Sequence, residues 1–171
     1  FRFGLDLGCE WKGIDFSMFW QGVAKRDLWL DGPMFWGISG GEWQSTGLKE
    51  HLDYYRPENT TSVFGPNTNA YFPKMYMSKD MNQKVQTRYL QNGAYARLKN
   101  IQLGYTFPTQ IINKLHMQKL RVYVSAENVL TITSLPSGFD PETTYSSYSD
   151  GNSGKTYPLQ TTISFGLNAT F

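Results

Sequence analysis

The strongest constraint on the fold is a strict alternation of apolar and polar residues over residues 159–171. One parity is mostly apolar and holds Leu159, Thr161, Ile163, Phe165, Leu167, Ala169 and Phe171, whereas the other parity is polar without charge. Successive side chains of a β-strand point to opposite faces of the sheet. The alternation therefore predicts a strand over residues 159–171 with one apolar face and one polar face.

Four further segments alternate in the same way, and they are joined by connections that are short and long in turn. These segments are residues 1–10, 14–23, 95–107 and 119–131. Residues 11–13 and 108–118 make short connections, whereas residues 24–94 and 133–158 make long ones. If the strands are antiparallel, both short connections lie at one end of the sheet and both long ones at the other. Short periplasmic turns and long external loops are typical of bacterial outer-membrane barrels.

Strand length favours the same fold class. A strand of about ten residues is about 33 Å long, and a tilt near 40° lets it span about 25 Å, the height of the apolar band of a membrane barrel. No stretch has the roughly 18 apolar residues that a transmembrane helix needs. We therefore predict an all-β fold, a transmembrane antiparallel β-barrel fragment that crosses the outer membrane several times.

Five strands cannot close such a barrel, because single-chain bacterial barrels have even strand numbers from about 8 upwards. We therefore expect the chain to be a piece of a longer protein. A soluble β-sandwich, such as a carbohydrate-binding domain, is the alternative. It explains the alternation equally well, but it explains the strand lengths and the end-specific loops less well.

Charge and histidine content limit the functions that the chain can have. The net charge of +2 is too small to indicate nucleic-acid binding. His51 falls in a predicted external loop and His116 in a periplasmic turn, so the two cannot share a catalytic or metal site. We expect both to be solvated, and we expect Asp140 and Glu142 to belong to a turn around Pro141 rather than to a pair of catalytic carboxylates.

The sequence contains no phosphate-binding loop and no nucleophile motif. We therefore predict no enzyme activity, no cofactor and no metal. An outer-membrane barrel hydrolase is a second alternative, and it would have to use His51 at the outer rim.

The long connection over residues 24–94 is the candidate binding region because it is rich in aromatic residues. A loop of this length without clear secondary structure is usually functional or disordered, and aromatic content argues against disorder. Its candidate ligand- or partner-binding residues are Trp29, Trp36, Trp43, Tyr54, Tyr55 and Tyr71. The competing interpretation is that the rings fold the loop on itself as a small core, and for any single residue we favour it slightly.

Several segments match motifs that occur together in one protein family. Residues 92–105, NGAYARLKNIQLGY, resemble the motif NGSYLRLKNVTLGYT, and residues 120–130, LRVYVSAENVL, resemble LRVYVSGQNLFT. Similar matches are found at residues 53–59, 67–73, 138–142 and 165–171, in the same order. Together these segments resemble the SusC/RagA-like TonB-dependent transporters of Bacteroidetes. The departures are Arg56, where the family often has threonine, and residues 60–66, which are inserted within a proline motif.

The resemblance implies a 22-stranded barrel with a plug domain, of which this chain would supply the last five strands. It implies import of an oligosaccharide or a peptide with a SusD-like surface lipoprotein, driven by TonB through an N-terminal region absent from this sequence. Phe171 resembles the terminal aromatic residue that the barrel-assembly machinery recognises.

Two groups of charged residues follow from the predicted faces. The first group is inward-facing, is expected to form a polar lumen wall against the plug, and comprises Arg2, Asp6, Glu10, Asp15, Arg121 and Glu127. Arg97 and Lys99 instead share the parity of lipid-facing residues near the outer end of their strand. We expect their side chains to extend into the headgroup zone of the outer-membrane lipid.

Overall fold

The computed structural model describes residues 1–37, 47–76, 82–144 and 156–171. The chain folds into two compact units. The sheet unit comprises Phe1–Arg26, Gly93–Ser134 and Leu159–Phe171, and the loop unit comprises Asp27–Asn92 and Leu135–Pro158.

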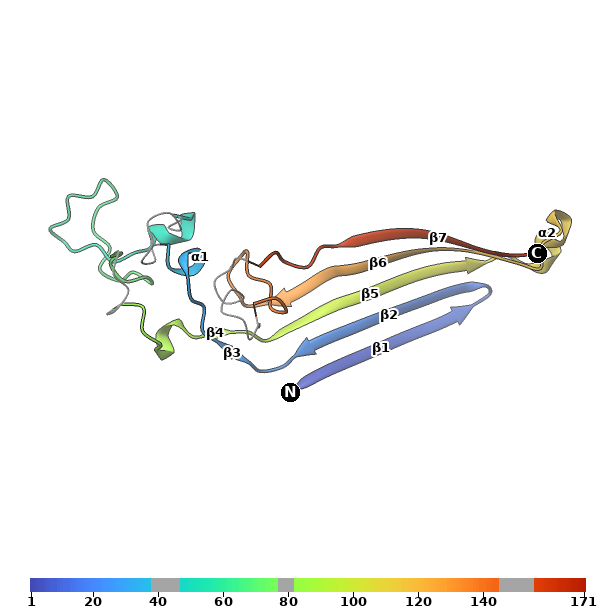
Figure 1. Cartoon of the computed structure of the whole chain (residues 1–171), viewed down its shortest axis with the longest axis horizontal. Helices are drawn as coiled ribbons and strands as arrows, with labels where there is room; N and C mark the ends of the chain where they lie inside the picture. Colours follow the sequence, from blue (N-terminus) through green and yellow to red (C-terminus); the bar gives the residue numbers. More distant parts are fainter. Residues whose placement is uncertain (38–46, 77–81, 145–155) are drawn as a thin grey trace. The chain divides into compact units, whose positions relative to one another are not determined.

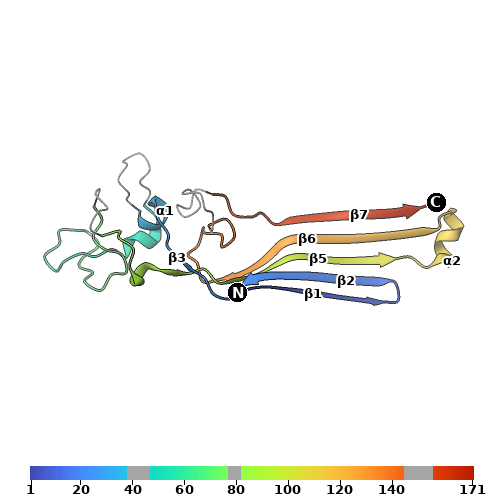
Figure 2. The same cartoon turned by 60° about the horizontal axis from the view of Figure 1, so that its bottom comes forward.

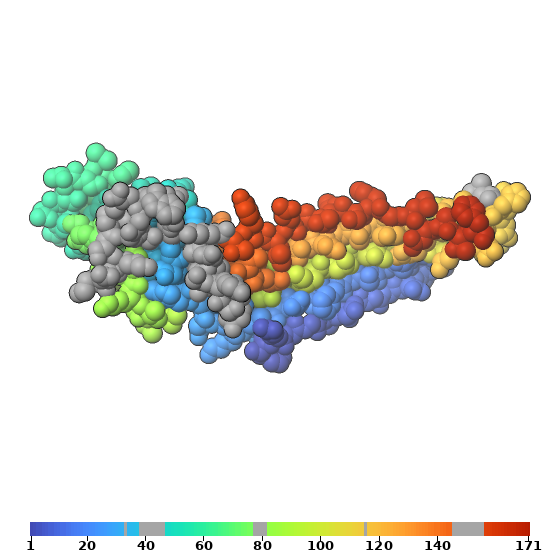
Figure 3. All heavy atoms as spheres, viewed as in Figure 1, coloured from blue at the N-terminus to red at the C-terminus, as the bar shows by residue number. Residues whose placement is uncertain are grey.

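The sheet unit is one five-stranded antiparallel sheet in the order β1-β2-β5-β6-β7 (Figure 1). Its strands are β1 (Arg2–Trp11), β2 (Ile14–Val23), β5 (Tyr95–Thr106), β6 (Lys119–Thr133) and β7 (Thr162–Thr170). In the space-filling view the strands lie side by side, with β1 at one edge and β7 at the other (Figure 3). The all-β antiparallel arrangement predicted from alternation is confirmed.

Both short connections lie at the same end of this sheet (Figure 2). The β1–β2 turn has left-handed backbone at both central residues, Lys12 (φ 48°) and Gly13 (φ 87°), as a two-residue hairpin turn requires. A Cβ at Gly13 would lie 2.6 Å from the carbonyl oxygen of Thr106, so only glycine fits there. The β5–β6 connection contains the short helices α2 (Thr109–Ile112) and η4 (Asn113–Leu115).

Large apolar side chains of the sheet unit are exposed on one face. The strand pairs Leu7–Met18, Phe16–Leu103, Leu103–Val124 and Val124–Phe165 place neighbouring apolar residues of all five strands on that face. Its exposed members include Leu5, Leu7, Ile14, Leu103, Ile163, Phe165 and Leu167. A continuous apolar face of this kind marks a surface that another apolar phase or protein covers. No helix in the described ranges is long and apolar enough to cross a membrane.

The register between β2 and β5 contains one irregularity. Phe19 pairs with Asn100, and the next residue, Trp20, pairs with Leu98, so Lys99 is an extra residue on β5. Because the side-chain repeat of a strand is two residues, one extra residue moves the rest of the strand to the opposite face. The bulge therefore divides β5 into two parts of opposite parity.

This bulge overturns the predicted position of Arg97. Arg97 pairs with Gln21 and Thr131, and it lies on the polar face rather than the apolar one. It is only 2% exposed, and its Nε donates a hydrogen bond to Thr131 Oγ1 at 2.7 Å. The expectation of an arginine extending into lipid headgroups is wrong for Arg97, because parity counted along the sequence does not include the extra residue.

The last strand begins at Thr162, three residues after the predicted start at residue 159. Asn128 of β6 has left-handed backbone (φ 53°), which asparagine tolerates. Its carbonyl accepts a hydrogen bond from Thr161 Oγ1 at 3.0 Å, and its Nδ2 donates to the carbonyl of Gln160 at 3.2 Å. These side-chain contacts replace the regular ladder, which ends at the pair Glu127–Thr162.

The loop unit contains short elements around a small hydrophobic core. Its elements are β3 (Asp27–Leu28) paired with β4 (Gln91–Asn92), helix α1 (Pro33–Trp36), and the 3₁₀ helices η2 (Lys49–Leu52) and η3 (Thr87–Tyr89). Its core comprises Leu28, Leu30, Phe35, Trp36, Phe72, Tyr89, Leu135 and Phe139. The second long connection thus supplies Leu135 and Phe139 to a core built mainly from the first.

Candidate functional site

The aromatic residues of the loop unit pack chiefly against one another. The Trp36 ring centroid lies 4.8 Å from that of Tyr89 and 5.1 Å from that of Phe35, both in edge-to-face geometry. Trp36 is 2% exposed, and its Nε1 donates to the carbonyl of Leu30 at 3.2 Å. An indole that is buried and hydrogen-bonded in this way is a core residue. The self-folding interpretation therefore describes Trp36 better than a role in ligand contact.

The other predicted binding residues differ in exposure. Trp29, Tyr54 and Tyr71 are partly buried and pack against the core. Tyr55 is 41% exposed, which leaves its ring available to a ligand or partner. Trp43 lies outside the described residues.

Tyr89 links two parts of this aromatic core. Its hydroxyl donates to the carbonyl of Tyr71 at 3.1 Å, and the two ring centroids lie 5.5 Å apart. Burial raises the pKa of the Tyr89 hydroxyl above its ordinary value, so it stays a neutral donor. This hydrogen bond fixes the position of Tyr71, which lines a pocket of the loop unit.

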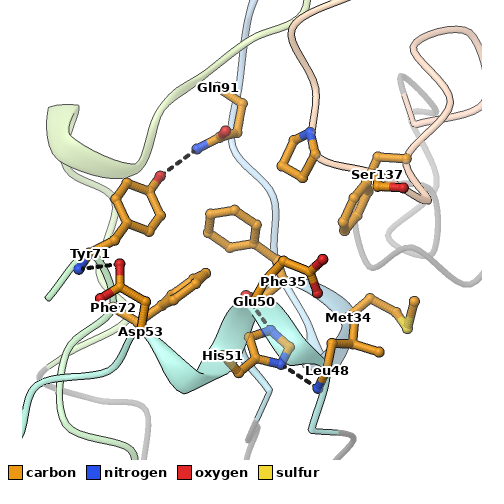
Figure 4. Close-up of a pocket in the computed structure, with 12 residues that line it drawn as sticks. Met34, Phe35, Leu48, Glu50, His51, Asp53, Tyr71, Phe72, Gln91 and Ser137 are labelled. Atoms are coloured by element: carbon orange, nitrogen blue, oxygen red, sulfur yellow. Dashed lines mark hydrogen bonds between the residues drawn. The ribbon is translucent and has the colours of Figure 1, made fainter.

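A pocket of about 400 Å³ opens in the loop unit, and we call it the Phe35 pocket (Figure 4). Its lining is mostly apolar and comprises Met34, Phe35, Leu48, Glu50, His51, Asp53, Tyr71, Phe72, Gln91, Pro136, Ser137 and Phe139. Concave, mainly apolar pockets with a few polar groups are the usual form of ligand sites. Of the predicted binding residues in the described ranges, this pocket contains only Tyr71.

His51 forms one wall of the Phe35 pocket, and its environment differs from the prediction. It is 4% exposed rather than solvated. Its Nδ1 accepts a hydrogen bond from the backbone N–H of Leu48 at 2.9 Å, so its Nε2 carries the proton and donates to the carbonyl of Phe35 at 3.0 Å (Figure 4). Both ring nitrogens therefore bind backbone groups, and neither is available as the general base that the hydrolase alternative needs.

Glu50 and Asp53 place two carboxylates beside the same pocket. Asp53 follows the 3₁₀ helix η2 directly, and its backbone N–H donates to the carbonyl of Glu50 at 3.2 Å. The two carboxylates lie on different sides of the pocket, that of Asp53 beside Tyr71 and that of Glu50 beside Phe35 (Figure 4). The sequence alone did not indicate that these two carboxylates line a pocket. The apolar residues around them come from distant parts of the chain and are brought there only by folding.

A second, more open pocket of about 470 Å³ lies elsewhere in the loop unit. Tyr55 and Tyr76 contribute exposed rings to it, and Lys74 and Arg88 contribute positive charge. Arg88 is held in place by a hydrogen bond of 2.7 Å from its guanidinium group to the carbonyl of Ala70. The predicted residue Tyr55 therefore lies at a polar and aromatic surface that differs in charge from the Phe35 pocket.

The Asp140 turn agrees with its prediction. Asp140 Oδ1 accepts a hydrogen bond from the backbone N–H of Glu142 at 2.8 Å, as an Asx turn requires. Within the described ranges no group of three or more His, Cys, Asp or Glu side chains is placed to hold a metal ion.

The polar face of the sheet unit contains an ion pair that crosses a strand. Arg121 Nε of β6 donates to Asp15 Oδ2 of β2 at 2.9 Å, and a second guanidinium nitrogen binds the other carboxylate oxygen. The intervening strand has Gly104 at this point. A Cβ there would lie 2.5 Å from the carboxylate and 2.6 Å from the guanidinium, so the glycine leaves room for the pair.

Known proteins resemble the whole chain. No protein-family model matches it. Two curated proteins of Formosa agariphila, TonB-dependent receptor P3 and TonB-dependent receptor P26, are 28% and 25% identical over 100% and 99% of the chain. The chain spans only 16% and 17% of their lengths.

Solved structures also match almost the whole chain. A structure of the RagAB peptide importer in the "closed-closed" state matches 99% of this chain with a TM-score of 0.67 and 25% identity. A structure of the RagAB peptide transporter matches 98% with a TM-score of 0.65 and 25% identity. Each match covers 17% of the longer chain. The chain therefore resembles TonB-dependent receptors over almost its whole length, in sequence and in fold.

This resemblance explains the exposed apolar face of the sheet unit. The sheet is part of a larger outer-membrane β-barrel, and lipid covers its apolar face. The soluble β-sandwich alternative is therefore excluded, because a sandwich would bury the face against a second sheet.

Proposed function

We propose that the full protein imports a nutrient, either an oligosaccharide or a peptide, across the outer membrane in a TonB-dependent manner. The observation that supports this most strongly is the match of almost the whole chain, in both sequence and fold, to TonB-dependent receptors and a peptide importer. These relatives are receptors and importers rather than enzymes. We therefore assign the chain a role in binding and passage and not in catalysis.

The two units would divide this work. The polar face of the sheet unit, with the Asp15–Arg121 pair, would line the hydrated lumen against a plug domain. The loop unit would face the outside of the cell, where both long connections of the sheet lead. There it would meet cargo and a SusD-like surface lipoprotein. TonB would act on a plug-side region of the full protein that these 171 residues do not include.

Uptake by living cells tests the import proposal. Cells that express the full protein would be offered fluorescently labelled oligosaccharide and peptide pools, and accumulation would be compared with cells that lack the gene or lack TonB. We expect accumulation of at least one pool to fall to background in both deletion strains. Unchanged accumulation of every pool in both strains would contradict the proposal.

The lipoprotein partner needs a separate test. The full protein would be purified from the outer membrane in detergent with a tag on the barrel, and the co-purifying proteins would be identified by mass spectrometry. We expect one surface lipoprotein in near-stoichiometric amount. Recovery of the barrel alone, under conditions in which it remains folded, would argue against a stable lid.

A further inference from the structure

The size and lining of the Phe35 pocket limit what it can bind. At about 400 Å³ it is at the small end of ligand pockets, which range from about 300 to 1,000 Å³. Its walls include Phe35, Phe72 and Phe139, and Gln91 and Ser137 are among its few uncharged polar groups. A sugar would bury hydroxyl groups here without enough partners, which is costly. One large apolar side chain fits this lining better.

The charge of the Phe35 pocket places a second requirement on its ligand. Asp53 is held in place because its two carboxylate oxygens accept hydrogen bonds from Asn67 Nδ2 at 2.8 Å and from the backbone N–H of Tyr71 at 3.1 Å. Both donors are neutral amides, so the negative charge of Asp53 is not cancelled. Figure 4 shows Asp53 and Tyr71 joined in this way at the pocket.

Glu50 adds a second negative charge that is free to bind. Across the described ranges neither Glu50 nor Asp53 forms an ion pair, and no lysine or arginine lines the pocket. A carboxylate without a cationic partner beside an apolar pocket favours a ligand whose cationic group lies next to an apolar group. The N-terminal residue of a peptide combines an α-ammonium group and a side chain within one residue.

We propose that the Phe35 pocket binds the N-terminal residue of a peptide, with its large apolar side chain among the phenylalanines and its ammonium group against Glu50. This inference rests on the proposed import function and narrows its cargo at this site. The pocket would select for a free amino terminus and for an aromatic or aliphatic first residue. Peptides blocked at the amino terminus would bind elsewhere or weakly.

Binding to the purified full-length protein in detergent tests the selectivity. The probes are the peptide Phe-Ser-Gly-Ser, its N-acetylated form, and Ser-Ser-Gly-Ser, each titrated by calorimetry. We expect acetylation to weaken binding about three- to tenfold, the size of a partly exposed charge contact. Replacing the first residue by serine should abolish measurable binding, because the apolar contact supplies most of the affinity.

Two variants locate the binding in this pocket. Glu50→Gln removes one charge and should weaken binding of the free peptide about three- to tenfold while leaving that of the acetylated peptide unchanged. Ser137→Trp puts a large ring at the exposed rim and should abolish binding of both. Glu58→Gln is the matched control, because Glu58 is an exposed acid of the same unit that does not line the pocket. Heat-modifiability gels would confirm that each variant has a folded barrel.

The results separate this inference from the import proposal. Equal affinity for free and acetylated peptides, or no effect of both Glu50→Gln and Ser137→Trp, would overturn the pocket assignment even if cells still take up peptides through the protein. Uptake that does not depend on TonB would instead contradict the import proposal, whatever the purified protein binds. Selective binding that disappears in Ser137→Trp is the result that supports the inference.

Discussion

The sheet unit and the loop unit treat large apolar side chains in opposite ways. In the sheet unit Phe165 is 84% exposed and Leu167 is 64% exposed, whereas in the loop unit Leu30 is fully buried. A water-soluble fold hides its large apolar groups, and a membrane barrel presents them to lipid. The contrast indicates that one chain contains a unit stabilised by lipid and a unit stabilised by its own hydrophobic core.

The two units also use different polar contacts. The sheet unit holds its polar face with an ion pair that spans three strands, from Asp15 to Arg121 over Gly104. The loop unit uses side chains to bind backbone groups, as His51 and Arg56 do. Irregular backbone lacks a ladder of its own, so side chains must satisfy its donors and acceptors. We therefore expect each unit to respond to a different class of mutation.

The largest effect should come from Trp36→Ala. Truncating a fully buried tryptophan costs about 3–5 kcal/mol, which is enough to unfold a core as small as that of the loop unit. We expect rapid proteolysis within residues 27–92 and loss of ligand or lipoprotein binding, with a barrel that still migrates as a folded species in heat-modifiability gels. A barrel that fails to assemble would show that the two units are not separable.

The converse mutation in the sheet unit is Gly104→Val. The new side chain would collide with both members of the Asp15–Arg121 pair, and we expect a loss of about 1–3 kcal/mol in barrel stability. Gly8→Ala is the matched control, because a Cβ there meets only a carbonyl oxygen at an ordinary 3.6 Å. The measurement is the urea midpoint of barrel unfolding in detergent. Equal midpoints for the two variants would show that the ion pair does not stabilise the sheet.

His51→Ala should have a smaller effect that is confined to the loop unit. It leaves the N–H of Leu48 and the carbonyl of Phe35 without their partner, at a cost of about 1–3 kcal/mol. His51→Asn should recover part of this, because its amide oxygen can accept the hydrogen bond from Leu48. Protection of the loop-unit amides from hydrogen exchange should be highest in the wild type, lower in His51→Asn and lowest in His51→Ala. If the loop-unit amides of His51→Ala exchanged at the wild-type rate, His51 would not stabilise the loop unit.

Alternation predicted the sheet unit well because a two-residue repeat is a local property of the sequence. The alternation could not reveal the bulge at Lys99, because a single unpaired residue leaves no mark in the composition or hydropathy of the strand. Arg97 was therefore predicted on the wrong face. The loop unit has no repeat at all. Its core joins Phe35 with Phe139 across 104 residues of sequence, and its pocket depends on that contact. Only the aromatic content of the loop indicated that it would fold.

The membrane topology can be tested directly by finding on which side of the outer membrane each end of the sheet lies. In a Cys9→Ser background, Glu58→Cys in the loop unit and Lys114→Cys in the β5–β6 connection would be exposed on intact cells to a maleimide that cannot cross the outer membrane. We expect Glu58→Cys to be labelled at once and Lys114→Cys to be labelled only after the outer membrane is permeabilised. Labelling of Lys114→Cys on intact cells, or failure to label Glu58→Cys, would contradict an outer-membrane barrel with an external loop unit.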